Sequence, residues 1–109
     1  MVEIIKNNLD KIIEACKEHH VRALYLFGSA ARTNDFTNNS DVDFVVEYNY
    51  KDETNDNNVF ERVENAELLK EKLKAIIARD VDLIQEKNIR NKFLKYFINK
   101  DKKLIYGIS

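Results

Sequence analysis

The stretch from Leu24 to Val46, LYLFGSAARTNDFTNNSDVDFVV, contains the two segments that decide the fold. Each is a run of apolar residues of the kind that forms buried strands. The first run closes on Gly28, one of only two glycines in the chain, and the second is interrupted by Asp41 and Asp43. A glycine and two acids inside core-forming sequence indicate that this part of the chain does more than pack.

Working outward from this stretch, the apolar positions alternate between helical and strand spacing. The expected elements are a helix over residues 3–18, a strand over 22–27, a short helix from 29 to 32, a strand over 42–48, a helix starting near 59, a strand over 81–85, a helix over 89–98 and an edge strand over 104–106. The helix near 59 should bury a stripe made of Val63, Ala66, Leu69, Leu73 and Ile76. This order predicts an α+β fold, with a small mixed sheet packed against helices in two layers, and a single domain over residues 1–109.

Composition sets the broad class. The chain has 109 residues and a formal net charge of −1, so no overall electrostatic attraction to nucleic acid or to an anionic membrane is expected. The single cysteine, Cys16, lies on the apolar stripe of the first helix and is expected to be a small core residue. No apolar run is long enough for a bilayer and no signal-peptide pattern is present, which favours the cytoplasm.

The acids in the second strand favour a metal site. Alternation along a strand places Asp41 and Asp43 on one side and Val42, Phe44 and Val46 on the side of the core. Two carboxylates at ~5 Å repel by about 3 kcal/mol at an effective dielectric of ~20, and a bound divalent cation would offset this repulsion. Asp-x-Asp by itself is also common in turns and at solvated edges, so it does not decide the matter alone.

The third strand repeats the pattern. Asp82 stands between apolar neighbours in the sequence VDLI. If this strand lies beside the second, three carboxylates meet, which is enough for two metal ions in phosphoryl or nucleotidyl transfer. Asp80 shares the facing of Asp82 but lies at the start of the strand, so we interpret it as a solvated acid.

The Gly-Ser turn suggests a phosphate site. Gly28 allows close approach of the backbone to a ligand, and Ser29 offers a hydroxyl and an N–H at the start of the short helix. Arg32, one turn later, would add a cation. A plain turn from strand to helix with a capping serine would have the same sequence, so Gly-Ser alone decides nothing.

Taken together, the motifs FGSAAR, SDVDF and VDL resemble the nucleotidyltransferases of the DNA polymerase β-like superfamily. The short length, LYLFGSAAR and the tail NIRNKFLKYFIN with LIYG are most similar to the minimal nucleotidyltransferases. Members of that family are commonly antitoxins encoded beside an all-helical HEPN-type toxin that cleaves RNA. The resemblance implies a nucleotidyltransferase fold over nearly the whole chain.

The resemblance also implies roles for individual residues. Gly28 and Ser29 match the phosphate-binding turn, and Arg32 matches an arginine near the triphosphate. Asp41 and Asp43 match the metal-binding pair. Asp82 matches the third acid, which serves as a base or as a further metal ligand.

Two departures from the family pattern lie beside the expected phosphate site. Thr33 stands where many members have glycine, and the loop from residue 30 to 40 is about one residue longer than usual. Both departures could alter nucleotide preference or rate. The catalytic residues are all present, which argues against an inactive member.

The leading hypothesis is therefore a Mg²⁺-dependent enzyme, with two ions expected, that transfers AMP from ATP to a tyrosine hydroxyl of a HEPN-type toxin. One alternative is an antitoxin that acts mainly by binding and covering the toxin, through its apolar helices and the LIYG segment. Another is nucleotidylation of a small molecule, although the relatives that do this usually carry an extra substrate domain. Neither a membrane nor a nucleic acid is expected as a direct partner.

Overall fold

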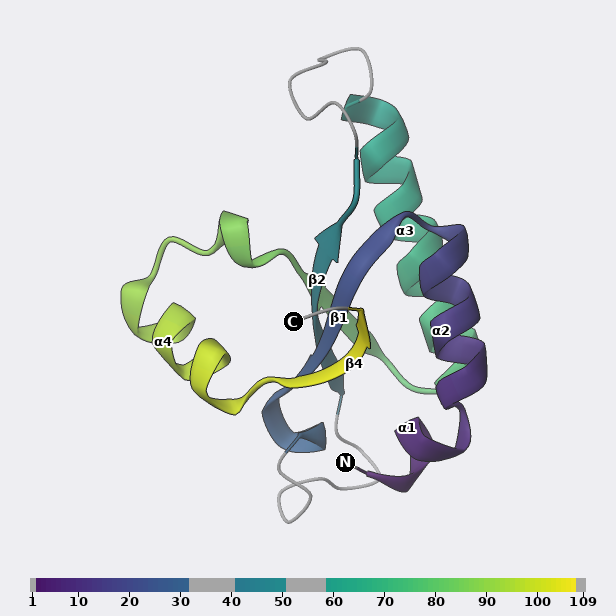
Figure 1. Ribbon diagram of the computed structural model, residues 1–109, viewed down its shortest axis with the longest axis horizontal. Helices are drawn as coiled ribbons and strands as arrows, with labels where there is room; N and C mark the ends of the chain where they lie inside the picture. The colour runs from purple at the N-terminus through teal and green to yellow at the C-terminus, as the bar shows by residue number, and fades with distance from the viewer. Residues whose placement is uncertain (1, 32–40, 51–58, 108–109) are drawn as a thin grey trace.

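The computed structural model describes residues 2–31, 41–50 and 59–107, which form one four-stranded sheet with helices on both faces (Figure 1). The elements in chain order are α1 (Glu3–Asn7), α2 (Leu9–Glu18), β1 (Val21–Phe27), η1 (Gly28–Ala30), β2 (Val42–Tyr48), α3 (Val59–Ile77), β3 (Val81–Ile84), η4 (Glu86–Asn88), α4 (Lys92–Asp101) and β4 (Lys103–Gly107). The strand order is β3-β2-β1-β4, with β2 and β3 parallel and β1 antiparallel to both β2 and β4. The predicted small mixed sheet packed with helices is confirmed.

The larger core lies between one face of the sheet and α1, α2 and α3, where α2 and α3 run side by side (Figure 1). Val42, Phe44 and Val46 point into this core, as strand alternation predicted. Cys16 is fully buried there, and burial raises the pKa of its thiol to about 12. The thiol therefore stays protonated at neutral pH, which fits a packing role.

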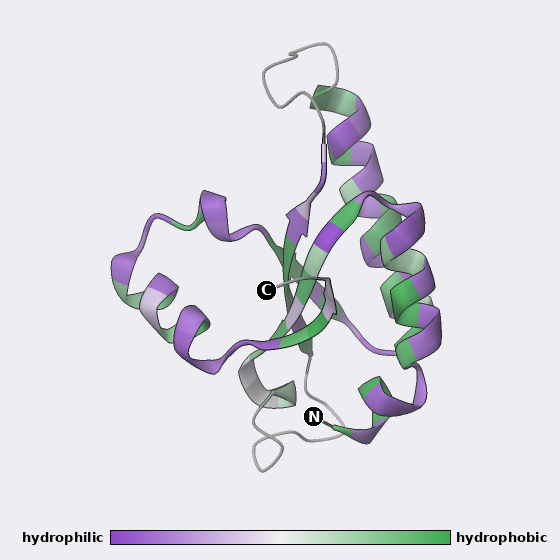
Figure 2. Ribbon diagram, viewed as in Figure 1, coloured by the Kyte–Doolittle hydropathy of each residue, from purple (hydrophilic) through white to green (hydrophobic). Residues whose placement is uncertain are grey.

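The opposite face carries a smaller core beneath α4. It consists of Ala23, Tyr25 and Val45 from the strands and Ile98 from α4. Figure 2 shows hydrophobic residues concentrated in the central strands, whereas η4 is hydrophilic. This face therefore keeps most of its polar side chains near solvent.

Two helix boundaries differ from the prediction, and each has a local cause. The helix over 3–18 is broken at Asn8, whose side-chain amide donates to the carbonyl of Ile4 at 2.8 Å and so competes with the helical ladder. The last helix starts at Lys92 rather than residue 89, because the Asn91 side chain accepts hydrogen bonds from the amides of Phe93 and Leu94 and caps it there.

One expectation about a buried helix face was also wrong. Val63 is exposed, because the first turns of α3 extend past the ends of β1 and β2 (Figure 1) and only Leu69, Leu73 and Ile77 are fully buried. On α4 only Ile98 is buried, and the apolar side chains of Phe93, Leu94 and Phe97 are exposed. Within the described parts of the chain, no helix has the length and apolar character to cross a membrane.

Candidate active site

Two acidic residues occupy matching positions on neighbouring strands. Asp43 is the second residue of β2, Asp82 is the second residue of β3, and the two are partners in the parallel register. The third strand therefore does lie beside the second, which was the condition for the acids to meet. Because paired residues in a sheet point to the same face, the two side chains meet on the face opposite the larger core.

Gly28 follows β1 directly and lies against the carboxylate of Asp43. Its φ is +76°, a conformation that side chains rarely adopt, and a Cβ placed there would come within 2.6 Å of Asp43 Oδ2. The strand register explains this approach, since Phe27 pairs with Asp43 at the end of β1. The missing side chain of Gly28 thus makes room for an acid of the site, a role that the sequence did not reveal.

The electrostatics of Asp43 reflect this crowding. Burial, a side-chain hydrogen bond with Asp82, and the negative charges of Asp82 and then Asp41 raise the pKa of the Asp43 carboxyl to about 6. A hydrogen bond between two carboxyl groups requires one shared proton, because two carboxylates accept but cannot donate. Because this pKa lies below neutral pH, most of the shared proton is lost at pH 7, which leaves two neighbouring carboxylates for a cation to neutralise.

Three acids were expected to converge, and the structure brings two into contact. Asp41 precedes β2, is exposed, and acts on Asp43 through its charge. Within residues 2–31, 41–50 and 59–107, no three His, Cys, Asp or Glu side chains are gathered closely enough to hold a metal ion. A carboxylate pair still suits Mg²⁺, which proteins usually bind through one or two carboxylates together with substrate phosphates.

The structure describes some of the remaining predicted site residues only in part and others not at all. The backbone of Ser29 lies in η1, a single 3-10 turn, while its side chain is outside the described part of the structure. Arg32 and Thr33 also lie outside the described residues, so their roles stay predictions. Asp80 is exposed and forms an ion pair with Lys74 at 3.8 Å, which fits the solvated acid that we expected.

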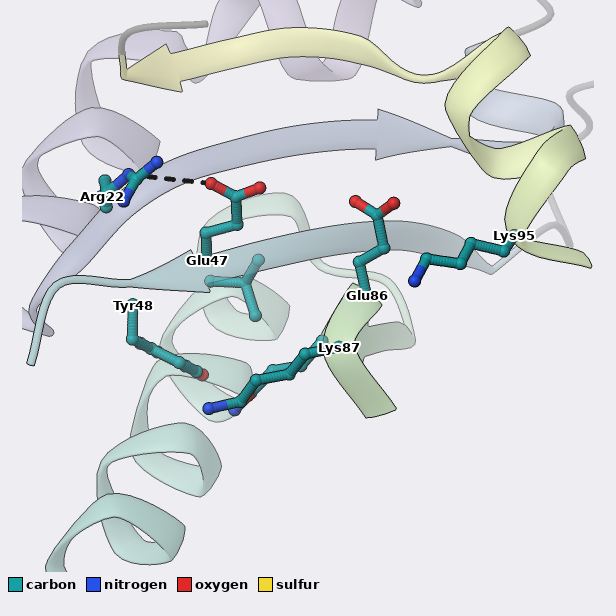
Figure 3. A pocket seen from close by; sticks show the side chains of 8 residues that line it. Arg22, Glu47, Tyr48, Glu86, Lys87 and Lys95 are labelled. Carbon is teal, nitrogen blue, oxygen red and sulfur yellow. Dashed lines mark ion pairs between the residues drawn. The ribbon is translucent and has the colours of Figure 1, made fainter. Parts of the chain in front are cut away.

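Sequence reasoning missed a hollow of about 360 Å³ farther along β2 (Figure 3). Its lining includes Arg22, Glu47, Tyr48, Glu86, Lys87 and Lys95. These side chains come from β1, β2, η4 and α4, so no local motif could have pointed to them. Glu47 lies on the same face of β2 as Asp43, four residues further on.

The chain is similar to known proteins over most of its length. The family model described as polymerase beta, nucleotidyltransferase matches residues 10–109. The chain belongs to the polymerase β nucleotidyltransferase family. It is also 39% identical over 103 residues to the provisionally named protein adenylyltransferase MJ1379 of Methanocaldococcus jannaschii, covering 94% of this chain and 93% of the relative.

Solved structures share the fold. One, provisionally described as a minimal nucleotidyltransferase, matches with a TM-score of 0.70 at 20% identity over 93% of this chain and 92% of that one. A chain in the crystal structure of a toxin–antitoxin with AMP-PNP matches with a TM-score of 0.68 at 24% identity, over 94% of this chain and 75% of that one. A chain from the complex of a tri-AMPylated HEPN toxin of Shewanella oneidensis with an MNT antitoxin matches with a TM-score of 0.61 at 22% identity, over 94% of this chain and 72% of that one.

These findings confirm the family resemblance and the enzyme class. The protein is a nucleotidyltransferase of the polymerase β type. Within that class, the paired acids on β2 and β3 and the glycine against them are the described features around which the reaction can be built.

Proposed function

We propose that this protein is a protein adenylyltransferase that transfers AMP from ATP to a tyrosine hydroxyl of a HEPN-type toxin, and so acts as the antitoxin. The observation that carries the proposal is the contact of Asp43 with Asp82 beside Gly28. The name of the M. jannaschii relative supports adenylyl transfer to protein. The toxin–antitoxin structures with AMP-PNP and with an AMPylated HEPN toxin support the choice of nucleotide and partner.

In this mechanism Asp41, Asp43 and Asp82 would hold Mg²⁺, expected as two ions. Bound there, the metal would neutralise the negative charge that develops on the phosphates. Gly28 keeps the β1 end close to Asp43, and Ser29 and Arg32 would contact the triphosphate. The tyrosine oxygen attacks the α-phosphorus and the bond to the β-phosphate breaks, releasing pyrophosphate. Asp82, which is exposed at the site, accepts the proton of the hydroxyl.

Labelled ATP tests this proposal, because the position of the label in ATP identifies the group that is transferred. The purified protein is mixed with Mg²⁺ and the product of the neighbouring reading frame, once with ATP labelled at the α-phosphate and once with ATP labelled at the γ-phosphate. Only the α-label should appear on the partner, on a tyrosine. Label from the γ-phosphate would indicate a kinase, and absence of both labels with folded protein would contradict the proposal.

A second candidate is an antitoxin that acts by covering its partner, and the outer face of α4 favours it. Phe93, Tyr96 and Phe97 are 79%, 61% and 51% exposed, an unusual number of exposed aromatic residues for so short a helix. The LIYG segment offers less free surface to a partner, since it lies in strand β4, which is paired with β1.

The paired variant Asp41→Asn with Asp43→Asn separates the two candidates. Loss of both metal-binding charges should lower transfer by about 10³-fold or more, while the complex with the toxin stays intact. Loss of neutralisation with the complex intact favours the enzyme. Full neutralisation by this variant favours simple covering.

A further inference from the structure

The edge of β2 is open beyond the point where β3 ends. The last pair of the β2–β3 ladder joins Val45 to Ile84, so Val46, Glu47 and Tyr48 lack a partner strand on that side among the described residues. Their other side is paired with β1. Unpaired strand edges offer backbone N–H and C=O groups that an extended peptide can bind.

The hollow of about 360 Å³ lies at this open edge and carries surplus positive charge (Figure 3). Both of its acids already have cationic partners: Glu47 pairs with Arg22 at 3.8 Å, and Glu86 pairs with Lys102 at 3.4 Å.

Lys87 and Lys95 supply the surplus charge. In the part of the chain that the structure describes, neither has an ion pair or a side-chain hydrogen bond, and both are exposed. Lys95 reaches in from α4 while Lys87 extends along the opposite wall (Figure 3). The two ammonium groups therefore flank the hollow and are available to a negative group.

Tyr48 also lines the hollow. Its hydroxyl is buried and, among the described residues, lacks a hydrogen-bond partner. Its ring packs against the larger core, on the face of β2 opposite Glu47, so this hydroxyl is not counted among the groups that bind a ligand.

We propose that the open edge of β2, with Lys87 and Lys95, binds an extended acidic segment of the acceptor protein. The inference rests on the proposed function and names the feature by which the acceptor is recognised. Glu47 lies four residues beyond Asp43 on the same face, about 13 Å along the strand. Because β3 occupies the β2 edge beside Asp43, an acceptor segment bound beside Glu47 must cross the face of the sheet to bring its hydroxyl to the acid pair.

Backbone amide NMR shifts of the isotope-labelled protein, without nucleotide or metal, test this binding. The probe is a capped six-residue peptide of alternating valine and glutamate, and the comparison peptide has glutamine in place of glutamate. The glutamate peptide should shift the amides of residues 46–48 and 85–87, and the glutamine peptide should bind at least about tenfold more weakly.

A double charge-reversal variant and a matched control test whether Lys87 and Lys95 bind the peptide. The double variant Lys87→Glu with Lys95→Glu should weaken binding of the glutamate peptide at least about tenfold. The control, Lys11→Glu with Lys17→Glu, changes the charge equally on the exposed side of α2 and should leave binding unchanged. The same spectra report whether each variant is folded.

Three results overturn the inference: equal binding of both peptides, equal loss in both double variants, or shifts at residues 46–48 and 85–87 from inorganic phosphate alone that match those of the peptide. The labelled ATP assay is run in parallel to keep the two proposals apart. Transfer of AMP without binding of the peptide overturns only the proposal of a recognition site at β2. Peptide binding without transfer to any protein overturns the proposed function.

Discussion

The two faces of the sheet are built from the same strands and serve different ends. One face, under α1, α2 and α3, holds a continuous core of apolar side chains. On the other face, the described part of the chain has a buried core of Ala23, Tyr25, Val45 and Ile98, and beside it lies the contact between Asp43 and Asp82. A small domain can therefore keep its main apolar core on one side of a sheet and its acidic pair on the other.

Strand alternation makes this separation possible, because successive residues of one strand point to opposite faces of the sheet. In β2, Val42, Phe44 and Val46 face the helices while Asp43 and Glu47 face the opposite way. A change on one face therefore reaches the other only through the backbone. The predictions below test whether stability and chemistry are as separate as the packing indicates.

The largest effect on folding should come from the face under α1, α2 and α3. Leu73 is fully buried in the larger core, so Leu73→Ala should lower the free energy of unfolding by about 3–4 kcal/mol. That is a large share of the ~5–15 kcal/mol available to a domain. Chemical denaturation followed by circular dichroism measures it.

Ile98→Ala is the matched substitution on the other face. Ile98 is equally buried but belongs to the four-residue core under α4. Its replacement should cost about 2 kcal/mol, at the low end for such a change, because α4 can detach while the rest stays folded. NMR shifts limited to α4 and its strand contacts would support this view. An equal loss in both variants would show that the two faces fold as one unit.

The next substitution, at Gly28, affects both folding and the acid pair. Gly28→Ala would place a Cβ at 2.6 Å from Asp43 Oδ2, at a φ of +76°. We expect a loss of about 1–2 kcal/mol in unfolding free energy and, because Asp43 must move, a fall of about 10²-fold in transfer rate. Denaturation and the α-labelled ATP assay measure the two effects separately.

Gly107→Ala provides the control for strain alone. Its Cβ would lie 2.2 Å from the carbonyl oxygen of Arg22 at a φ of +109°, on the β4 side of the sheet. Stability should fall at least as much as in Gly28→Ala, while the transfer rate per folded molecule should stay within about twofold. If both glycine variants lose the same activity, the contact of Gly28 with Asp43 has no special role.

Much of the fold was readable from local pattern. β2 was predicted with its observed ends, and Asp43 was correctly placed on the face away from the core. The side-by-side arrangement of Asp43 and Asp82 was also anticipated, because each acid interrupts an apolar strand at the same position.

Most of what the sequence did not reveal depends on distant parts of the chain, and one helix break depends on a local hydrogen bond. The exposure of Val63 follows from where the sheet ends beneath α3, and the break at Asn8 follows from one side-chain hydrogen bond that competes with the helix. Gly28 was expected to approach a ligand, but its contact with Asp43 arises from the register of β1 against β2. The lysines at the open edge of β2 come from η4 and α4, so only the folded chain brings them together.

The smallest effect concerns the proton held by the acid pair. The pKa of Asp43 is raised to about 6 in the folded protein, chiefly by burial and by the hydrogen bond with Asp82, from 3.8 in an unperturbed chain. Protonation therefore favours the folded state. The stabilisation is fully present below pH 3.8 and is lost as the pH rises through about 6.

In metal-free protein, the free energy of unfolding of the wild type relative to Asp43→Asn should thus fall by about 1 kcal/mol between pH 4.5 and 7. That figure is reduced from the full linkage value because Asp43 is only partly buried. Comparison with Asp43→Asn cancels the titration of the other acids. Asp80→Asn, which changes an exposed acid paired with Lys74, should show no such pH-dependent difference.

Saturating Mg²⁺ should stabilise the wild type at pH 7 more than Asp43→Asn, because the cation then takes the place of the shared proton. A pH profile that is the same in the wild type and Asp43→Asn would mean that the two carboxyl groups do not share a proton, and the case for a cation at this end of the sheet would lose its electrostatic basis.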